Sequence, residues 1–448
     1  MKRFVALSLG IVSCALAAPA ASSQKPPPPM QLDLAHAEAI ALRQSPTVNA
    51  AQFKALAARQ VVRQVRSAFF PQITAEFTGV ITAGTGDSRL GATGGLSNPT
   101  VLNRESNGIL LSQLITDFGR TWNLTEAQKN LALSEAQRSA LARAKVLLLV
   151  DQCYFQAQQA QAVLRVADET VMERQLLADQ VGALAKSELK SELDASLARV
   201  NLDQAKLLRL EAGNHVDSAF AELSNALGYR EPHRFALVAI PQYAPPRGNL
   251  AECIAQALAS RPEARSLRNE RDAATQLVAA NRAAHLPKVS LIGAAGRTPV
   301  GQASTTPVEG DYAMAGINVE LPIFTGFFLS AKDQESALRA RAAEQSLHEV
   351  EDLIAKDVEV SLLNTTTASD KINVTASLLT NAEQAYDLAE SKYKIGITSI
   401  VELSQAQLAK LQAQIDHTSA TYEYQIDRLI LDFQVGAPKF LDPVTTNH

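Results

Sequence analysis

The chain has 448 residues, with 42 Lys and Arg against 46 Asp and Glu, and a formal net charge of −4 at pH 7. This balance gives no sign of a polyanionic partner, and basic and aromatic residues are not clustered as they are for nucleic-acid binding. Aromatic residues make up only 5% of the chain, few for large compact cores, and the middle is rich in residues typical of long helices and coiled coils.

Residues 1–20 have the pattern of a secretory signal peptide. A basic start precedes an apolar stretch at 4–12, and small residues surround Ala20. The apolar stretch is too short for a transmembrane helix, so we expect cleavage near Ala20 and an extended Pro-rich leader at 21–33. The residues before Cys14 also resemble a bacterial lipobox, which would place a lipid on Cys14. Cleavage near Ala20 is favoured because Cys14 falls early in the chain.

Residues 34–228 are predicted to form a first structural repeat, which begins with two helices. The first helix ends before Pro46. The second covers residues 47–70, where apolar residues recur at helical spacing without Gly or Pro. Pro71 ends this second helix, because proline cannot continue the hydrogen-bond pattern.

The period of the pattern then changes from helical to two, which is typical of β-strands. Across residues 72–82 the odd positions are mostly apolar, as at Phe77, and the even positions are mostly polar, as at Thr74 and Thr78. After a loop rich in Gly, Ser and Asn, a second strand is predicted at 108–116. Each strand has about ten residues, the length that a tilted barrel strand needs to cross a bilayer.

A very long helix is predicted after the second strand. No Gly or Pro occurs between residues 120 and 181, so we expect a helix of about 60 residues and roughly 90 Å at ~1.5 Å per residue. The chain turns at 182–186 and returns to about residue 228. Because this return segment is too short to cover the distance alone, the helix at 47–70 should stack end to end on it.

A second repeat is predicted at 250–436, after a linker at 229–249 that is rich in Pro and Gly and is expected to pack as an equatorial belt. Its predicted parts are strands at 288–297 and 312–321, a helix free of Gly and Pro at 327–395, and a turn at 395–399. A C-terminal tail covers 437–448.

Four strands in one chain cannot close a barrel, and open strand edges leave backbone groups without hydrogen bonds in lipid. Two chains would give eight strands and a lumen filled by side chains, whereas three would give twelve strands and a channel. Thr74, Thr78 and Asn318 would face that channel. The predicted fold is therefore mainly α-helical, with a duplicated helix–strand–strand–helix repeat, a long helical barrel and a trimeric membrane β-barrel.

Three segments carry a resemblance to a known family. They run from Ser112 to Arg120, from Leu321 to Gly326 and from Tyr393 to Leu403. In these segments, and over nearly all of residues 34–436, the chain resembles the TolC-like outer membrane efflux proteins. The resemblance implies a homotrimer with a twelve-stranded barrel in outer-membrane lipid and a helical tunnel in the periplasm of a Gram-negative bacterium. It also implies a periplasmic adaptor and an inner-membrane transporter as partners, in tripartite efflux or type I secretion.

The two turns furthest from the strands are candidates for adaptor docking, because members of the resembled family present these turns to their adaptors. Gly182 and Gly396 are predicted to end the long helices with positive φ. A role as helix ends alone is the alternative, and both roles can hold together. The candidate docking residues are Val181, Gly182, Leu184, Ile395, Gly396 and Ile397.

The same resemblance suggests a gate just past the second turn. Glu402 matches the first of two acidic positions that line the closed tunnel entrance in the family, but the second position is Gln405 here, and a basic position of the family is Thr398. An acidic ring would therefore be weaker in this chain. The alternative for Glu402 is ordinary solvated helix surface. Tyr393 either forms a hydrogen bond across the constriction or packs between the rods, and packing is slightly favoured.

No catalytic or cofactor site is predicted. The histidines are scattered without the spacing of metal ligands, no Gly-rich phosphate loop follows a strand, and no nucleophile elbow occurs. The leading hypothesis is thus a passive exit duct without cofactor or metal. A periplasmic coiled-coil adaptor or scaffold protein is the alternative. The sequence does not identify the cargo or the class of pump.

Overall fold

The computed structural model describes residues 31–80, 104–239, 249–300 and 308–441. The predicted signal peptide, Cys14 and most of the leader lie outside these residues, as do parts of the linker and of the tail. Within the described residues, no helix is long and apolar enough to cross a membrane.

The principal elements come in two similar series. The first is α1 (Leu34–Gln44), α2 (Pro46–Arg66), β2 (Gln72–Val80), β3 (Arg104–Thr116), α3 (Arg120–Lys186) and α4 (Glu192–Ala226). The second is α5 (Leu250–Ser260), α6 (Pro262–Ala283), β5 (Lys288–Val300), β6 (Val308–Glu320), α7 (Phe328–Lys394) and α8 (Ile400–Val435). The short elements are β1 (Gln31–Leu32), the 3-10 turn η1 (Ser67–Phe69), β4 (Ala236–Leu237) and α9 (Pro438–Leu441).

Proline sets the break between the first two helices of each series. Ser45 and Arg261 both have extended backbones, with ψ of 117° and 131°, because a following proline disfavours the helical conformation. The prolines then occupy the first turn of α2 and α6, where a missing N–H has no cost. Each long helix thus has a shorter partner helix that begins near the middle of the molecule's length.

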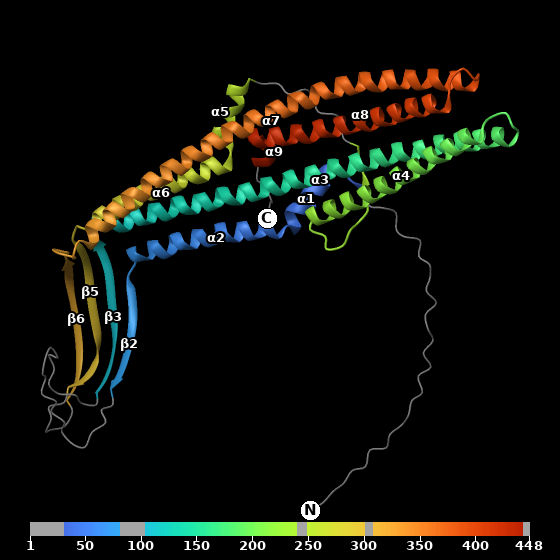
Figure 1. The fold of residues 1–448 in the computed structure, drawn as a ribbon. Coiled ribbons are helices and arrows are strands. Elements are labelled where there is room, and N and C mark those ends of the chain that lie inside the picture. Colours follow the sequence, from blue (N-terminus) through green and yellow to red (C-terminus); the bar gives the residue numbers. More distant parts are fainter. Residues whose placement is uncertain (1–30, 81–103, 240–248, 301–307, 442–448) are drawn as a thin grey trace, which may run out of the picture.

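The helices form a wall of four rods with the sheet at one end and the two helix turns at the other (Figure 1). Near the sheet the rods lie in the order α2, α3, α6, α7, and towards the turns in the order α4, α3, α8, α7. Helices α2 and α4 follow one another along α3, as the chain lengths predicted. With 67 residues each, α3 and α7 are roughly 100 Å long at ~1.5 Å per residue.

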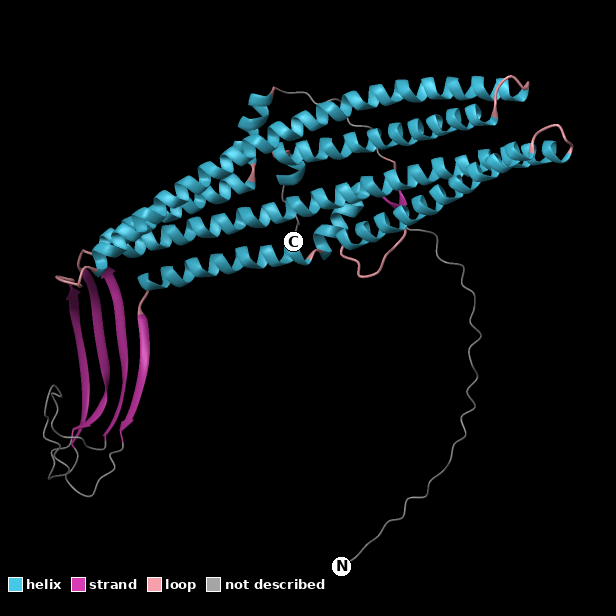
Figure 2. Cartoon of the chain, viewed as in Figure 1, coloured by secondary structure: helices cyan, strands magenta, loops and turns pink. Residues whose placement is uncertain are grey.

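The four long strands form one antiparallel sheet in the order β2-β3-β5-β6, so that β2 and β6 are its edges (Figure 2). Three of these strands, β3, β5 and β6, are longer than the sequence predicted, and β2 is described from Gln72 to Val80. Strand β3 begins at Arg104 rather than 108, β5 extends to Val300 rather than 297, and β6 covers Val308–Glu320 rather than 312–321. The extra residues are held in the strands by backbone pairing, as Val80 is with Arg104 and Val300 with Val308. Their amino-acid composition is typical of loops, so the sequence pattern did not indicate strands there.

The strand register places rows of residues on the two faces of the sheet. Ile73 lies opposite Leu111, which lies opposite Gly293, and Gly293 lies opposite Ala315. The next row on this face is Ala75, Ile109, Ala295 and Ala313. The apolar face of the first hairpin therefore continues into the apolar face of the second. Between these rows, the opposite face carries the row of Thr74, Leu110, Ala294 and Met314.

A belt of short elements packs on one face of the rods at mid-height. Strands β1 and β4 pair in parallel, and the hydroxyl of Tyr154 on α3 lies 2.9 Å from the carbonyl oxygen of Leu32 and accepts the N–H of Val238 at 3.0 Å. The belt core joins α1, α3 and α4 through fully buried residues such as Tyr154 and Leu223. We call α1, the β1–β4 pair and α9 the belt, and the side of the wall that they cover the belt face.

Candidate functional site

The second turn between long helices is built around a glycine, as the sequence predicted. Gly396 has a φ of 79°, and the N–H of Ile397 donates to the carbonyl of Lys392 at 2.9 Å, which closes the end of α7. Ser399 then begins α8 by accepting the N–H of Glu402 at 3.3 Å. The chain reverses direction here within a few residues.

The first turn lies further along the chain than predicted, and the prediction for Gly182 was wrong. Helix α3 continues to Lys186, and the residue with positive φ is Glu188, at 60°. The N–H of Leu189 donates to the carbonyl of Leu184 at 3.0 Å, and Ser191 begins α4 by accepting the N–H of Asp194 at 3.1 Å. Gly182 remains inside the helix because good helix formers follow it, and an interior glycine costs only about 1 kcal/mol.

The turns expose a set of large apolar side chains that differs from the predicted docking set. Val181 is 1% exposed and belongs to the core between the two helix pairs, so it offers no surface. Gly182 has no side chain to offer to a docking partner, and it lies before the turn. The exposed large apolar residues at the two turns and at the starts of α4 and α8 are Leu184, Leu189, Leu193, Ile395, Ile397 and Val401. Leu189 and Leu193 lie outside the predicted docking set because the sequence pattern placed the turn several residues too early.

Tyr393 packs between the rods. It is 6% exposed, and its hydroxyl has no hydrogen-bond partner among the described residues. The ammonium of Lys190, in the first turn, lies 4.3 Å from the centre of its ring. Burial raises the pKa of Tyr393, and the nearby carboxylate of Asp194 raises it further. Tyr393 thus connects α7 to the turn between α3 and α4.

Glu402 and Gln405 are both exposed near the start of α8. The carboxylate of Glu402 accepts a hydrogen bond from the hydroxyl of Thr398, while its own N–H is capped by Ser399. A carboxylate in the first turn also stabilises the helix through the helix dipole. Glu402 therefore has a structural role at the helix start, and its second carboxylate oxygen remains open to solvent or ions.

The motif between β3 and α3 forms the junction of sheet and rods. A carboxylate oxygen of Asp117 accepts the N–H of Thr121 at 2.8 Å, and Phe118 and Gly119 have positive φ values of 51° and 94°. At the matching junction before α7, Gly326 and Phe327 have φ values of 61° and 66°. These two motifs of the family resemblance thus redirect the chain from strand to rod.

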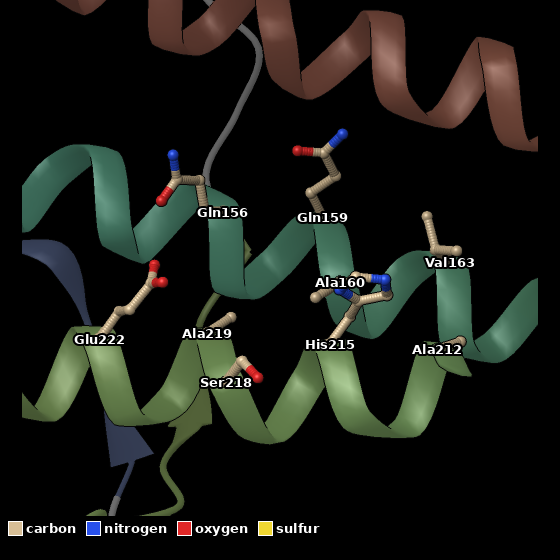
Figure 3. Close-up of a pocket in the computed structure, with 9 residues that line it drawn as sticks. All are labelled: Gln156, Gln159, Ala160, Val163, Ala212, His215, Ser218, Ala219 and Glu222. Atoms are coloured by element: carbon tan, nitrogen blue, oxygen red, sulfur yellow. The ribbon is translucent and has the colours of Figure 1, made fainter. Parts of the chain in front are cut away.

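The wall has a groove on each of its faces. A groove of about 490 Å³ between α3 and α8 is lined by Gln158 and Arg165 and includes Ala239, beside β4, so it lies on the belt face. A groove of about 390 Å³ between α3 and α4 is lined by Gln156 and Glu222 (Figure 3). Residues two apart on a helix point about 200° apart, so the second groove opens on the opposite face.

In this second groove small residues form the floor and polar residues the rim. Ala160 and Ala219 lie at its floor, and the carboxylate of Glu222 points from α4 towards α3 (Figure 3). Among the described residues, no group of His, Cys, Asp and Glu is arranged to hold a metal ion.

Comparison with known proteins gives a consistent family match. The family described as "Outer membrane efflux protein" matches residues 39–229 and 253–437. Protein CyaE of Bordetella pertussis is 26% identical over 409 residues, which are 90% of this chain and 84% of that protein. Outer membrane protein TolC of Vibrio cholerae is 23% identical over 402 residues, which are 87% of each chain.

Solved structures share the fold over nearly the whole chain. A membrane protein from Pseudomonas aeruginosa aligns with a TM-score of 0.81 and 19% identity, covering 94% of each chain. The open state of the MtrE outer membrane channel from Neisseria gonorrhoeae aligns with a TM-score of 0.73 and 19% identity, covering 90% of this chain and 88% of that one.

Proposed function

The chain belongs to the outer membrane efflux protein family, and from that membership we propose that it is the outer-membrane channel of a tripartite efflux or secretion system. In this role the sheet contributes to a pore in the outer membrane and the rods form a tunnel through the periplasm. The channel is passive, and an inner-membrane transporter supplies the energy. The observation that carries the proposal is a membrane-length sheet with two open edges, joined to rods of roughly 100 Å.

The two open edges support a homotrimer. Among the described residues, strands β2 and β6 each have one side without a partner strand, and a second copy of the chain offers the complementary edge. Three copies of four strands give a closed twelve-stranded barrel, wide enough for a channel. In this arrangement Ile73 and Ala313 face lipid, and Thr74 and Asn318 face the pore.

The edges of the helical wall support the same assembly. Along α4, the exposed residues Leu193, Val200 and Leu207 recur every seven positions. Along α7, at the other edge, Val374 and Leu388 are also exposed and lie on one heptad stripe. Apolar residues at heptad spacing are typical of helices that pack against another helix. We infer that α4 of one chain packs against α7 of the next.

The position of the belt supports a proposal for which face of the wall lies inside the tunnel. If α1, α9 and the β1–β4 pair lay inside a ring of three chains, they would obstruct the bore that transport requires. The belt face is therefore assigned to the outside, and the groove rimmed by Gln156 and Glu222 to the lumen. Glu402 and Gln405 are proposed as gate residues at the periplasmic end.

The exposed turns are proposed as the docking surface for a periplasmic adaptor. Leu184, Leu189, Leu193, Ile395 and Ile397 present apolar side chains at the end of the molecule furthest from the sheet. Exposed apolar patches of this kind mark protein contacts. The relatives are channel proteins, which argues against catalysis, and neither the family match nor the sheet fits the alternative of a periplasmic adaptor.

Membrane fractionation tests the proposal. On a sucrose gradient of cell membranes, the protein should appear with the outer membrane as a trimer that dissociates on heating in detergent. Recovery with the inner membrane would overturn the channel assignment and favour the adaptor.

A further inference from the structure

Helix α2 is strongly basic. It has four basic residues, Lys54, Arg59, Arg63 and Arg66, and no Asp or Glu. Its counterpart in the second repeat, α6, contains both acidic and basic residues. The positive charge is therefore a feature of the first repeat alone and is not imposed by the duplicated fold.

A groove of about 400 Å³ between α2 and α3 exposes part of this charge. Of its lining residues, Arg59, Arg63 and Lys129 are basic and none is acidic. The others are apolar, and among them Leu133 is 52% exposed. Neither Arg59 nor Arg63 pairs with a carboxylate among the described residues, and Arg63 donates to the amide oxygen of Gln60 at 3.2 Å. The groove therefore combines unneutralised positive charge with an apolar wall.

The groove lies at the end of the rods next to the sheet. Arg63 is within one turn of the end of α2, and the ammonium of Lys129 lies 5.8 Å from the centre of the Trp122 ring, in the first turn of α3. Trp122 is exposed, as is Phe70 just before β2. Exposed aromatic rings at this level, Trp in particular, are typical of the boundary between hydrocarbon and water. The groove therefore begins where a bilayer around the sheet would have its headgroups.

The groove opens on the belt face of the wall. On α3, Leu133 lies two heptads before Leu147 and three before Tyr154. Leu147 packs against Phe440 of α9, and the hydroxyl of Tyr154 contacts Leu32 of β1. Residues at heptad spacing share one face of a supercoiled helix. Because the belt face is assigned to the outside of the tunnel, the surrounding lipid reaches this groove and the cargo does not.

We propose that this groove binds the headgroup of an anionic phospholipid, such as phosphatidylglycerol, from the periplasmic leaflet of the outer membrane. Arg59, Arg63 and Lys129 bind the phosphate through charge-assisted hydrogen bonds, and the acyl chains run past Trp122 into the hydrocarbon. A soluble anion would use the basic residues alone, whereas a lipid also uses the apolar wall and the adjoining bilayer. The inference rests on the proposed function, because it needs the sheet to lie in a membrane.

One carboxylate beside the groove opposes the binding of an anion. Glu126 pairs with Lys129 at 2.5 Å, and it lies on α3 outside the groove lining. The pair neutralises Lys129 and leaves the charges of Arg59 and Arg63 available. Removing the carboxylate should therefore strengthen the binding of an anionic lipid, whereas removing either arginine should weaken it.

Trp122 is the only tryptophan of the chain, so its fluorescence reports on lipid at this groove. The trimer is placed in phosphatidylethanolamine vesicles that contain a small share of quencher lipid, either phosphatidylglycerol or phosphatidylethanolamine, with the same acyl chains brominated close to the glycerol. Brominated phosphatidylglycerol should quench Trp122 more strongly. Arg59→Gln and Arg63→Gln should each lower the relative affinity for phosphatidylglycerol about fivefold, and Glu126→Gln should raise it. Lys129 contacts the reporter ring itself and is left unchanged.

Arg120→Gln is the matched control. Arg120 is exposed at the membrane end of α3, but it lies nine positions before Lys129 and so points about 180° away from it. This variant should keep the wild-type preference for phosphatidylglycerol. An equal loss in Arg120→Gln and Arg63→Gln would replace the site with a general attraction to a basic surface and overturn the proposal.

The two brominated lipids also separate this inference from the proposed function. Equal quenching of wild-type Trp122 by both lipids would overturn the lipid site and leave the channel in place, because quenching by phosphatidylethanolamine shows that the junction of sheet and rods meets the bilayer. Quenching by neither lipid would overturn the membrane position of the sheet, and the lipid site with it.

Discussion

At the scale of single residues, the two turn glycines show how one residue type can have two roles. Gly396 adopts a backbone conformation that other residues rarely reach, whereas Gly182 lies inside α3, where a Cβ would meet no other side chain of the described residues within 4 Å. Both follow a long stretch without Gly or Pro, which made them look equivalent in the sequence. The residue that corresponds to Gly396 by its conformation is Glu188.

Alanine substitutions should separate the two glycines. Gly182→Ala should stabilise the protein by about 0.5–1 kcal/mol, because alanine costs less backbone entropy inside a helix. Gly396→Ala should destabilise it by about 1–2 kcal/mol, because a Cβ is strained at positive φ. Denaturant unfolding measures both changes, and equal effects of the two substitutions would contradict the assigned turn.

Glu402 carries a prediction about ion selectivity. In planar lipid bilayers, Glu402→Gln should reduce cation selectivity and relieve block by divalent cations added on the periplasmic side, because three symmetric carboxylates would form a ring there. Gln405→Glu is the matched variant, since it adds a second acidic position and should strengthen both effects. If neither property changes in Glu402→Gln, the side chain points away from the lumen and only stabilises the start of α8.

At the scale of elements, the strand pattern was predictable and the strand ends were not. Alternation placed Phe77 and Thr74 on opposite faces, and the register joins the apolar faces of the two hairpins. Arg104, at one strand end, is polar, and Val300 and Val308, at two others, are flanked by residues typical of loops. There the strand is held by backbone pairing to its neighbour, a contact that side-chain periodicity does not report.

Arginine substitutions on adjacent residues test the two faces. Ile73→Arg, in a middle row of the sheet, should cost about 2–4 kcal/mol and impair insertion if this face meets lipid. Thr74→Arg, at the same depth on the other face, should be tolerated. Phe77 shares its row with Arg297 and Asp311, an ion pair near the far end of the sheet, so Phe77→Arg should cost less than Ile73→Arg. Heat-stable assembly in outer-membrane extracts measures all three, and similar losses for Ile73→Arg and Thr74→Arg would contradict the register.

At the scale of the whole molecule, the long rods could be predicted because helices free of Gly and Pro have a known length per residue. The belt could not. Its core brings Leu32, Tyr154, Leu223 and Phe235 together from four separate segments, and nothing in the local pattern of any one segment indicates the others. The same limit applies to Lys439, whose ammonium pairs with the carboxylates of Glu38 and Asp151, hundreds of positions away in the chain.

Assembly into three chains is the prediction at this scale. Light scattering of the detergent-purified protein should give a mass of three chains of 48.0 kDa, each less the signal peptide predicted at residues 1–20. Replacing Val200 and Leu207 with Asp places charges on the exposed stripe of α4 and should weaken the trimer without changing the helix content by circular dichroism. A stable, well-folded monomer in the unsubstituted protein would contradict the proposed barrel.

The unpaired edges of β2 and β6 also have a consequence for how the channel is made. A single chain that entered the bilayer would bring two rows of bare peptide groups into hydrocarbon, at a cost of several kcal/mol for each unsatisfied group. Insertion of the chains into the membrane and association of the subunits are then a single kinetic step. The rate of insertion therefore depends steeply on the concentration of newly secreted chains. Low expression should delay insertion far more than in proportion, while chains awaiting partners accumulate in the periplasm.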